Sequence, residues 1–120
     1  MKKILLIEDD EFIVKPLAMA LKQEGFDLSV AGDGEAALEK LKNEQPDLIL
    51  LDLVLPKING FDVLKEIRAN SETKNIPVII LSNLARESEI KRGLAEGAND
   101  YLIKTNFSLM NLTKKIKSYL

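Results

Sequence analysis

Short runs of consecutive aliphatic residues alternate along the chain with longer segments whose apolar residues recur every three or four positions. The aliphatic runs lie at 4–7, 48–51, 78–81 and 101–103, and a more polar candidate lies at 27–31. Runs without alternation of apolar and polar residues are typical of parallel strands that helices cover on both faces. The polar segment at 27–31 should therefore be an edge strand.

The segments between these runs predict five amphipathic helices, which makes the chain a β/α repeat. The helices are expected at 12–23, 35–42, 61–69, 86–96 and 108–119. The side chains expected to face the sheet are, in chain order, Phe12, Ile13, Leu17, Ala20, Leu21, Ala37, Leu38, Leu41, Phe61, Leu64, Ile67, Ile90, Leu94, Leu109, Leu112 and Ile116.

Proline and capping residues set the expected helix ends. Pro16 is tolerated in a first turn but costs about 3 kcal/mol in a helix interior. We therefore expect the first helix to begin late, between Phe12 and Val14. Asp10 precedes that helix and Asn59 precedes the third, and we expect both side chains to act as N-caps.

The length and composition limit both the architecture and the chemistry. A chain of 120 residues buries roughly 65% of its unfolded surface, which suits one domain spanning residues 1–120. The absence of His and Cys excludes thiol nucleophiles, Ser-His-Asp triads, zinc sites built on imidazole or thiolate, and histidine autokinases. Carboxylate, hydroxyl and lysine chemistry remain.

Charge and hydropathy exclude two further classes of partner. The formal net charge of −2 argues against a nucleic-acid-binding face, which usually carries an excess of Lys and Arg. The apolar run at 4–7 ends at Glu8, Asp9 and Asp10, far short of a signal peptide or a membrane-spanning helix. We expect a cytoplasmic protein without direct nucleic-acid binding and without membrane insertion.

Polar residues follow four of the predicted strands at the point where each strand ends. Glu8 and Asp9 follow the first strand, Asp52 the third, Ser82 the fourth and Lys104 the last. In an open parallel α/β sheet, functional groups gather beyond the carboxyl ends of the strands, here between the first and the third. Each residue alone would be a solvated loop residue or a helix cap, but together they form a candidate site.

Three carboxylates in one place need a compensating cation. Two carboxylates about 5 Å apart repel by roughly 3 kcal/mol at an effective dielectric constant near 20. Oxygen ligands without His or Cys favour Mg²⁺, or similarly Mn²⁺ or Ca²⁺. Lys104 would pair with Asp52 or with an incoming anion, to which Ser82 can donate a hydrogen bond. These are the parts of a site for phosphoryl transfer to a carboxylate.

With these residues in place, the whole chain resembles the receiver domains of two-component response regulators and is similar to the single-domain chemotaxis regulator. The motifs occur in order: Glu8-Asp9 after ILLI, Asp52 in LILLDLVLPKING, Ser82 in VIILSN and Lys104 in GANDYLIK. The resemblance implies an α/β, flavodoxin-like doubly wound fold with a five-stranded parallel sheet in strand order 2-1-3-4-5. It also implies a phosphorylation-dependent signalling switch.

The resemblance further implies a role for each acidic residue. Asp52 would be the phosphoacceptor, Asp9 a direct Mg²⁺ ligand, and Glu8 a ligand acting through a bound water. Asp52 itself and the backbone carbonyl of Val54 would complete the protein's share of the metal shell. The phosphoryl donor would be a phosphohistidine on a sensor histidine kinase or a histidine phosphotransfer protein, so the missing histidine would lie on the partner.

The resemblance assigns the remaining site residues to binding and switching. Lys104 would contact a phosphoryl oxygen, and Ser82 would move toward the phosphoryl group as the ring of Tyr101 turns inward. These movements would alter the face made by the fourth helix, the last strand and the last helix, residues 85–96 and 107–120. A downstream protein of unknown identity would read that face.

Two departures from the family's pattern lead to expectations of their own. Thr105 stands where the family usually has a proline joined by a cis bond. A cis bond before a non-proline residue costs about 2.5–4 kcal/mol, so we expect a trans Lys104–Thr105 bond. In the family, the side chains two places after the phosphoacceptor and two places after the hydroxyl residue influence attack by water. Here they are Val54 and Leu84, which cannot orient a water, so we expect slow self-dephosphorylation.

Other interpretations stay open. A haloacid-dehalogenase-like phosphatase would need a second Asp at position Val54, and a flavodoxin-like electron carrier would need a glycine- and hydroxyl-rich loop in place of Glu8-Asp9-Asp10. The third alternative is a degenerate receiver acting only as a protein-interaction module, against which the intact acidic trio argues. We expect a single receiver domain without an output domain, either a stand-alone regulator or a piece of a longer chain.

Overall fold

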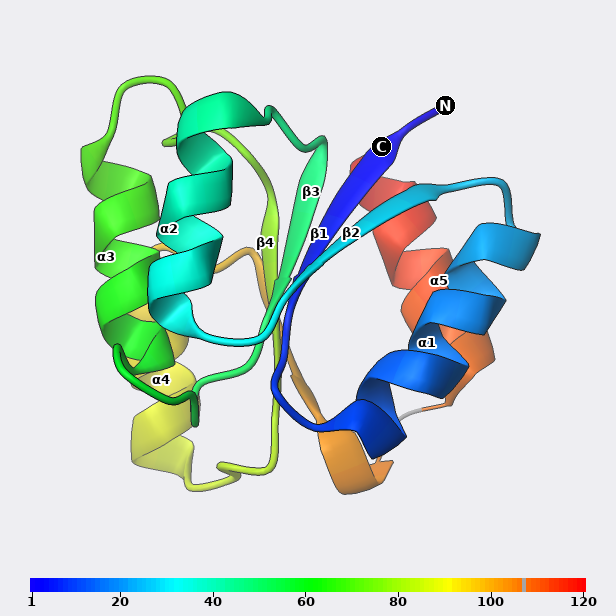
Figure 1. Cartoon of the computed structure of the whole chain (residues 1–120). Coiled ribbons are helices and arrows are strands. Elements are labelled where there is room, and N and C mark those ends of the chain that lie inside the picture. Colours follow the sequence, from blue (N-terminus) through cyan, green and yellow to red (C-terminus); the bar gives the residue numbers. More distant parts are fainter. Residues whose placement is uncertain (107) are drawn as a thin grey trace.

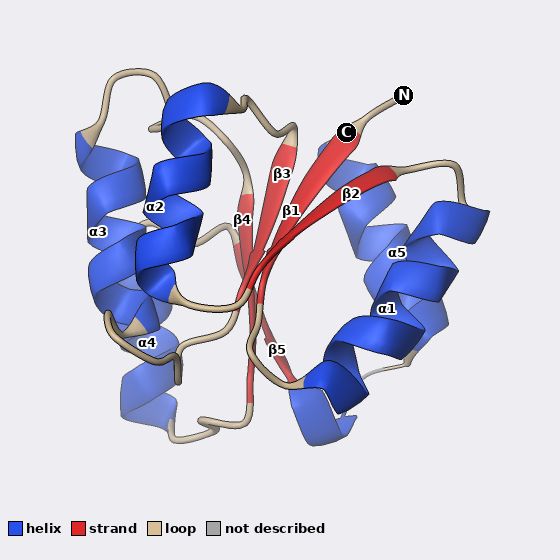
Figure 2. Cartoon of the chain, viewed as in Figure 1, coloured by secondary structure: helices blue, strands red, loops and turns tan. Residues whose placement is uncertain are grey.

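Five parallel strands form one sheet in the order β2-β1-β3-β4-β5 (Figure 2). The computed structural model describes residues 1–106 and 108–120. The strands are β1 (Lys3–Ile7), β2 (Asp27–Ala31), β3 (Leu48–Leu51), β4 (Val78–Ser82) and β5 (Asp100–Ile103). The expected α/β class, the strand order and the edge position of β2 are confirmed.

In the part of the chain that the structure describes, five α-helices cover the two faces of this sheet. They are α1 (Glu11–Gln23), α2 (Gly34–Asn43), α3 (Gly60–Ala69), α4 (Glu87–Ala95) and α5 (Leu109–Tyr119), with a 3₁₀ turn η1 (Lys104–Asn106) after β5. Helices α1 and α5 lie on one face, and α2, α3 and α4 on the other (Figure 1). Within the described residues, no helix is long and apolar enough to cross a membrane.

The central strands are aliphatic because both of their faces are buried. Every residue of β3 is fully buried. Alternate residues of β1 supply two separate cores: Leu5 and Ile7 pack with the α2 and α3 side, and Ile4 and Leu6 with α1 and α5. The sheet therefore holds its carboxyl ends in fixed register, and the loops that follow them converge on one edge of the molecule.

Three side chains expected to face the sheet are exposed instead. Phe12 is 90%, Leu94 45% and Leu109 40% exposed. The buried face of α1 runs through Leu17 and Leu21, and Phe12 lies off that row because successive residues are about 100° apart around a helix. In the same way, Leu94 follows the inward Gly93. Leu109 shares the face of Leu112 and Ile116, but it is the first residue of α5.

Helix α1 begins earlier than expected, and Pro16 lies inside it beyond the first turn. The early start has a local cause, because Asp10 Oδ1 accepts a hydrogen bond from the backbone N–H of Phe12 at 2.9 Å. Asn59 caps α3 similarly through the N–H of Asp62 at 3.1 Å. Both expected N-caps are confirmed. Phe107, the first residue of the expected 107–120 part of the output face, lies outside the described residues.

Candidate functional site

The acidic residues that follow β1 and β3 lie side by side. The register pairs Ile7 with Leu51, so Glu8 and Asp52 leave the sheet at the same level, and the N–H of Asp52 donates to the carbonyl of Ile7 at 3.0 Å. One carboxylate oxygen from each of Glu8, Asp9 and Asp52 lies within 4.8 Å of the others. The structure thus brings the expected acidic trio together at the carboxyl edge of the sheet.

The ammonium of Lys104 joins two of these carboxylates. Its Nζ lies 2.8 and 2.9 Å from the two oxygens of Glu8 and 3.0 Å from Asp52 Oδ2. The three side chains are 9%, 2% and 5% exposed. The contact with Asp52 was expected, whereas the contact with Glu8 was not. It exists because Lys104 reaches from the end of β5 past β4 and β3 to the end of β1.

Burial makes the carboxyl of Glu8 unusually basic. Desolvation raises its pKa from 4.5 to about 7, against the opposing hydrogen bond from Lys104. Burial tends to lower the pKa of Lys104, but its hydrogen bonds to Glu8 and Asp52 outweigh burial and raise that pKa. One ammonium among three carboxylates leaves an excess of negative charge in a poorly hydrated place. Such a site favours a further cation.

The donor set fits a hard divalent cation. The trio offers only oxygen ligands, the preference of Mg²⁺. It opens onto a hollow of about 530 Å³ lined by Glu8, Asp9, Asp10, Asp52, Val54, Asn83 and Lys104. Sequence reasoning did not single out Asn83, because an asparagine after a strand carries no signal of its own. Val54 lies at the rim, 59% exposed, with its N–H 3.4 Å from Asp52 Oδ1.

Ser82 and Tyr101 are linked through one residue of the loop after β4. The Oγ of Ser82, fully buried, accepts a hydrogen bond from the N–H of Leu84 at 3.2 Å. The hydroxyl of Tyr101 donates to the carbonyl of the same Leu84. The side chains of Ser82 and Tyr101 therefore both hold the β4–α4 loop, the first through the N–H of Leu84 and the second through its carbonyl.

Lys104 begins the turn η1, and its bond to Thr105 is trans, as are all peptide bonds among the described residues. The expected trans bond is thus confirmed. In spite of this bond, the side chain of Lys104 reaches the acidic trio.

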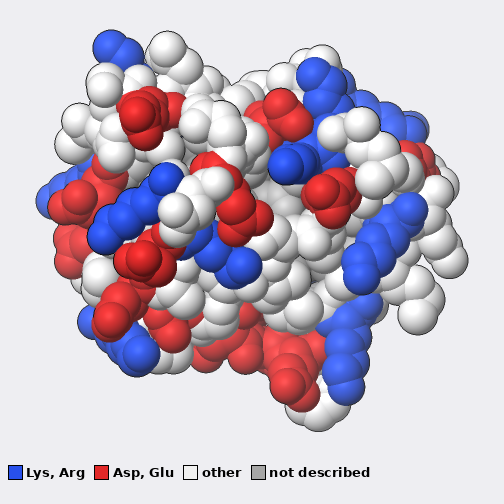
Figure 3. Space-filling model, turned by 45° about the horizontal axis from the view of Figure 1, so that its top comes forward, with Lys and Arg blue, Asp and Glu red and all other residues white. Residues whose placement is uncertain are grey.

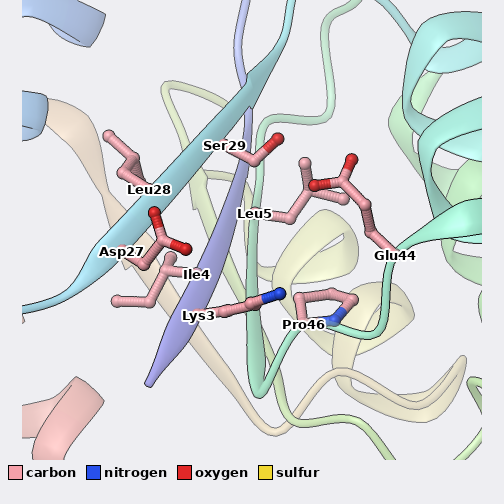
Figure 4. A pocket seen from close by; sticks show the side chains of 8 residues that line it. All are labelled: Lys3, Ile4, Leu5, Asp27, Leu28, Ser29, Glu44 and Pro46. Carbon is pink, nitrogen blue, oxygen red and sulfur yellow. The ribbon is translucent and has the colours of Figure 1, made fainter. Parts of the chain in front are cut away.

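A second hollow, of about 210 Å³, lies at the opposite end of β1 (Figure 4). Its walls mix the ammonium of Lys3 with the carboxylates of Asp27 and Glu44 around the apolar Leu5 and Pro46. Figure 3 shows this end of the molecule, where Lys and Arg stand beside Asp and Glu. The acidic trio with its buried lysine, and not this mixed surface, is the candidate functional site.

The sequence matches the profile of the response regulator receiver domain over residues 4–117. Relatives include sensory transduction protein RegX3 of Mycolicibacterium smegmatis, 42% identical over 122 residues, which cover 100% of this chain and 51% of RegX3. The DNA-binding response regulator MtrA of Mycobacterium leprae is 37% identical over 119 residues, which cover 99% and 51%. The chain spans about half the length of these relatives.

Solved structures agree with the sequence relatives. A response regulator 1452 receiver domain from Francisella superposes with a TM-score of 0.91 at 33% identity, covering 99% of this chain and 96% of that one. Chemotaxis regulator CheY4 of Vibrio cholerae gives 0.91 at 29%, covering 100% and 99%. The receiver domain of histidine kinase PA1611 from Pseudomonas aeruginosa, with magnesium coordinated in its active site cleft, gives 0.89 at 29%, covering 98% and 96%.

Proposed function

Since this chain belongs to the family of response regulator receiver domains, we propose that it is a signalling switch that accepts a phosphoryl group onto Asp52. The observation that carries the proposal is the buried Asp52 carboxylate, held between the Lys104 ammonium and the carboxylates of Glu8 and Asp9. The donor would be a phosphohistidine on a sensor histidine kinase or a histidine phosphotransfer protein. Residues 1–120 would act as one receiver domain, in the cytoplasm.

In the proposed reaction, a carboxylate oxygen of Asp52 attacks phosphorus and the bond from phosphorus to the imidazole nitrogen of the donor breaks. The imidazole leaves with the electron pair, and Asp52 becomes an acyl phosphate. Lys104, already within 3.0 Å of Asp52 Oδ2, would contact a phosphoryl oxygen. Asp9, Asp52, the Val54 carbonyl and, through a water, Glu8 would hold Mg²⁺, which supplies charge neutralisation for the transferring group.

The new phosphoryl group would be read through Ser82 and Tyr101. It adds roughly 1.5 to 2 negative charges next to Lys104, so the hydroxyl of Ser82 would gain a phosphoryl oxygen to which it can donate, and its Oγ would give up the hydrogen bond that it accepts from the N–H of Leu84. Movement of that loop would release the Tyr101 hydroxyl and change the α4-β5-α5 face. A downstream protein would recognise the changed face, without direct nucleic-acid binding by this domain.

The reaction is tested with a small phosphoryl donor. Incubated with Mg²⁺ and acetyl phosphate, the protein should gain about 80 Da in intact-mass spectrometry, and Asp52→Asn should not. Asp62→Asn, on an exposed carboxylate of α3, is the matched control and should behave as wild type. No mass gain in the wild type, or the same gain in Asp52→Asn, would leave the degenerate receiver as the better description.

Magnesium should stabilise the fold through the acidic trio. A ligand present at a hundredfold excess over its Kd adds about 2.7 kcal/mol to the free energy of unfolding, visible as a rise in Tm. Asp9→Asn should abolish the rise, and Asp10→Asn should keep it, because Asp10 is already used as the cap of α1. An equal rise in wild type and Asp9→Asn would place the cation elsewhere.

The acyl phosphate should decay slowly. Val54, which lines the site, and Leu84, two places after Ser82, have aliphatic side chains that can neither accept a proton from water nor orient it. A positioned polar group typically speeds a proton-transfer step by about 10²-fold or more. Replacing Val54 by Asn and Leu84 by Gln should therefore speed loss of the adduct by about tenfold or more. The time course of deconvoluted mass measures this, and an unchanged half-life in the double variant would refute the assignment.

A further inference from the structure

Arg68, near the end of α3, binds two segments of the chain, the loop before β4 and the turn between α4 and β5. Its Nε donates to the carbonyl of Gly97 at 2.9 Å, Nη1 to the carbonyl of Ile76 at 2.8 Å, and Nη2 to Asn99 Oδ1 at 3.0 Å. All three acceptors are neutral, and among the described residues no carboxylate lies within ion-pair distance of Arg68. The guanidinium thus donates its hydrogen bonds to two backbone carbonyls and one side-chain amide oxygen.

The turn between α4 and β5 is tightly fitted to this guanidinium. Gly97 has a φ of +114°, and a Cβ there would lie 2.9 Å from Cγ of Arg68. Asn99 Oδ1 also accepts from the N–H of Val78 at 2.9 Å, and the N–H of Asn99 donates to the carbonyl of Val78 at 2.8 Å. The turn is therefore bound to α3 and β4 at once.

The carboxyl-terminal half of α4 has further attachments. A Cβ on Gly93 would lie 2.7 Å from Ile80, so the helix backbone sits directly on β4 there. Arg92 stacks over the ring of Phe61 in α3 with 4.0 Å to the centroid, and Glu96 pairs with Lys65 at 3.6 Å. This half of α4 cannot shift without disturbing α3.

The amino-terminal end of α4 is held differently. Residues 85–88 are exposed, and the N-cap interaction between Arg86 and Glu89 lies on the surface. The loop before the helix is bound through Leu84, whose carbonyl accepts from Tyr101 and whose N–H donates to Ser82. These are the two groups that the proposed switch would rearrange.

We infer that Arg68 is the positioning residue that fixes the carboxyl-terminal end of α4, so that switching moves the amino-terminal end about this fixed point. The inference rests on the proposed function and adds the direction of the response. When Ser82 and Tyr101 release Leu84, the segment 85–90 changes place. The segment 96–99 stays bound to Arg68, so the changed surface lies at one end of α4.

Residue-resolved amide exchange separates the two ends. In the wild type, Mg²⁺ and acetyl phosphate should change exchange of the Glu89 and Ile90 amides by about fivefold or more, and that of the Ala98 and Asn99 amides by less than about twofold. In Arg68→Met, Ala98 and Asn99 should exchange about tenfold faster even without donor. The adduct on Asp52 should still form, which separates lost positioning from lost chemistry.

The control is Lys65→Met, which removes the other basic contact from α3 to this end of α4 but at a side chain that is 56% exposed. It should leave Ala98 and Asn99 within about twofold of wild type, because exposed ion pairs contribute little. If Arg68→Met does not fold, Arg68→Lys keeps the charge with fewer directed donors and should show the same faster exchange to a smaller extent.

Two results would overturn the inference: wild-type exchange at Ala98 and Asn99 in both Arg68 variants, or an equal response of both ends of α4 to phosphorylation in the wild type. A wild type that forms no adduct refutes the proposed function instead. The comparison of Arg68 variants without donor then still decides whether Arg68 fixes the end of α4.

Discussion

Replacing Lys104 by methionine should lower the free energy of unfolding by about 4 kcal/mol at neutral pH without divalent cations. Removal of one partner from a buried ion pair typically costs 3–5 kcal/mol, since the other partner keeps its charge without compensation. Lys104 is 9% exposed and pairs with two carboxylates. Methionine preserves most of the aliphatic volume, so the loss reports on charge and not on a cavity.

The stability lost in Lys104→Met should increase as pH rises. The pKa of Glu8 rises from 4.5 to about 7 on folding, so the native state binds more protons than the unfolded state between these values. Stability contributed by this group is therefore present below about pH 4.5 and is lost as pH rises through 7. Without Lys104 the ionised carboxyl is disfavoured further, so the gap between variant and wild type should widen from pH 5 to pH 8.

Urea unfolding at several pH values, with and without Mg²⁺, measures both effects. Lys115→Met is the matched control, because Lys115 also touches a carboxylate, Asp100 Oδ2 at 2.6 Å, but is 44% exposed. Exposed pairs contribute about 0–1 kcal/mol. Mg²⁺ should restore much of the stability lost in Lys104→Met. Equal losses in the two variants, or a gap that narrows with rising pH, would contradict the role of buried charge.

Gly60→Ala should cost about 3 kcal/mol or more, at the upper end of what overpacking causes. A Cβ at Gly60 would lie 2.3 Å from the carbonyl oxygen of Asp52 and 2.4 Å from Cα of Leu53. Both contacts are with backbone, which cannot rotate away as a side chain would. The N–H of Gly60 also donates to the carbonyl of Leu53 at 2.8 Å, so the start of α3 cannot retreat without losing that bond.

Gly32→Ala provides the comparison, because, its chain neighbours aside, no atom of the described residues lies within 4 Å of a Cβ at Gly32, and its φ is not left-handed. Its free energy of unfolding should stay within about 0.5 kcal/mol of wild type. Any folded Gly60→Ala protein should form the Asp52 adduct less readily, since the substitution pushes on the backbone of Asp52. If Gly60→Ala is as stable as Gly32→Ala, the backbone of the loop after β3 can shift to make room for the Cβ, and the expected cost of overpacking is wrong.

Much of the fold was predictable because each element carries its own signal. A parallel strand buried on both faces leaves an unbroken aliphatic run, as in Leu48–Leu51, and that pattern tolerates few other interpretations. The position of Asp52 next to Glu8 followed from the same logic, because parallel strands end at a common edge. The caps Asp10 and Asn59 were predictable since a capping side chain acts within three residues of itself.

The rest depended on contacts that sequence patterns do not encode. Phe12 and Leu94 are apolar at positions next to an inward row, and only the docked helix decides which residue of such a pair is buried. Arg68 looked like one charge among many on α3, and its acceptors, two carbonyls and one amide oxygen, lie in the loop before β4 and in the turn between α4 and β5. The bond from Lys104 to Glu8 joins residues 96 positions apart.

That last separation has a consequence for the order of events during folding. Contacts between residues far apart in the chain form late in folding. Closing the long loop between them costs conformational entropy before the contact can stabilise the chain. The strands β1 and β3 can associate with Glu8 and Asp52 already side by side while β5 is still undocked, and the ammonium arrives last. We therefore expect Lys104→Met to speed unfolding and leave the refolding rate nearly unchanged, so that the lysine governs how long each folded molecule persists.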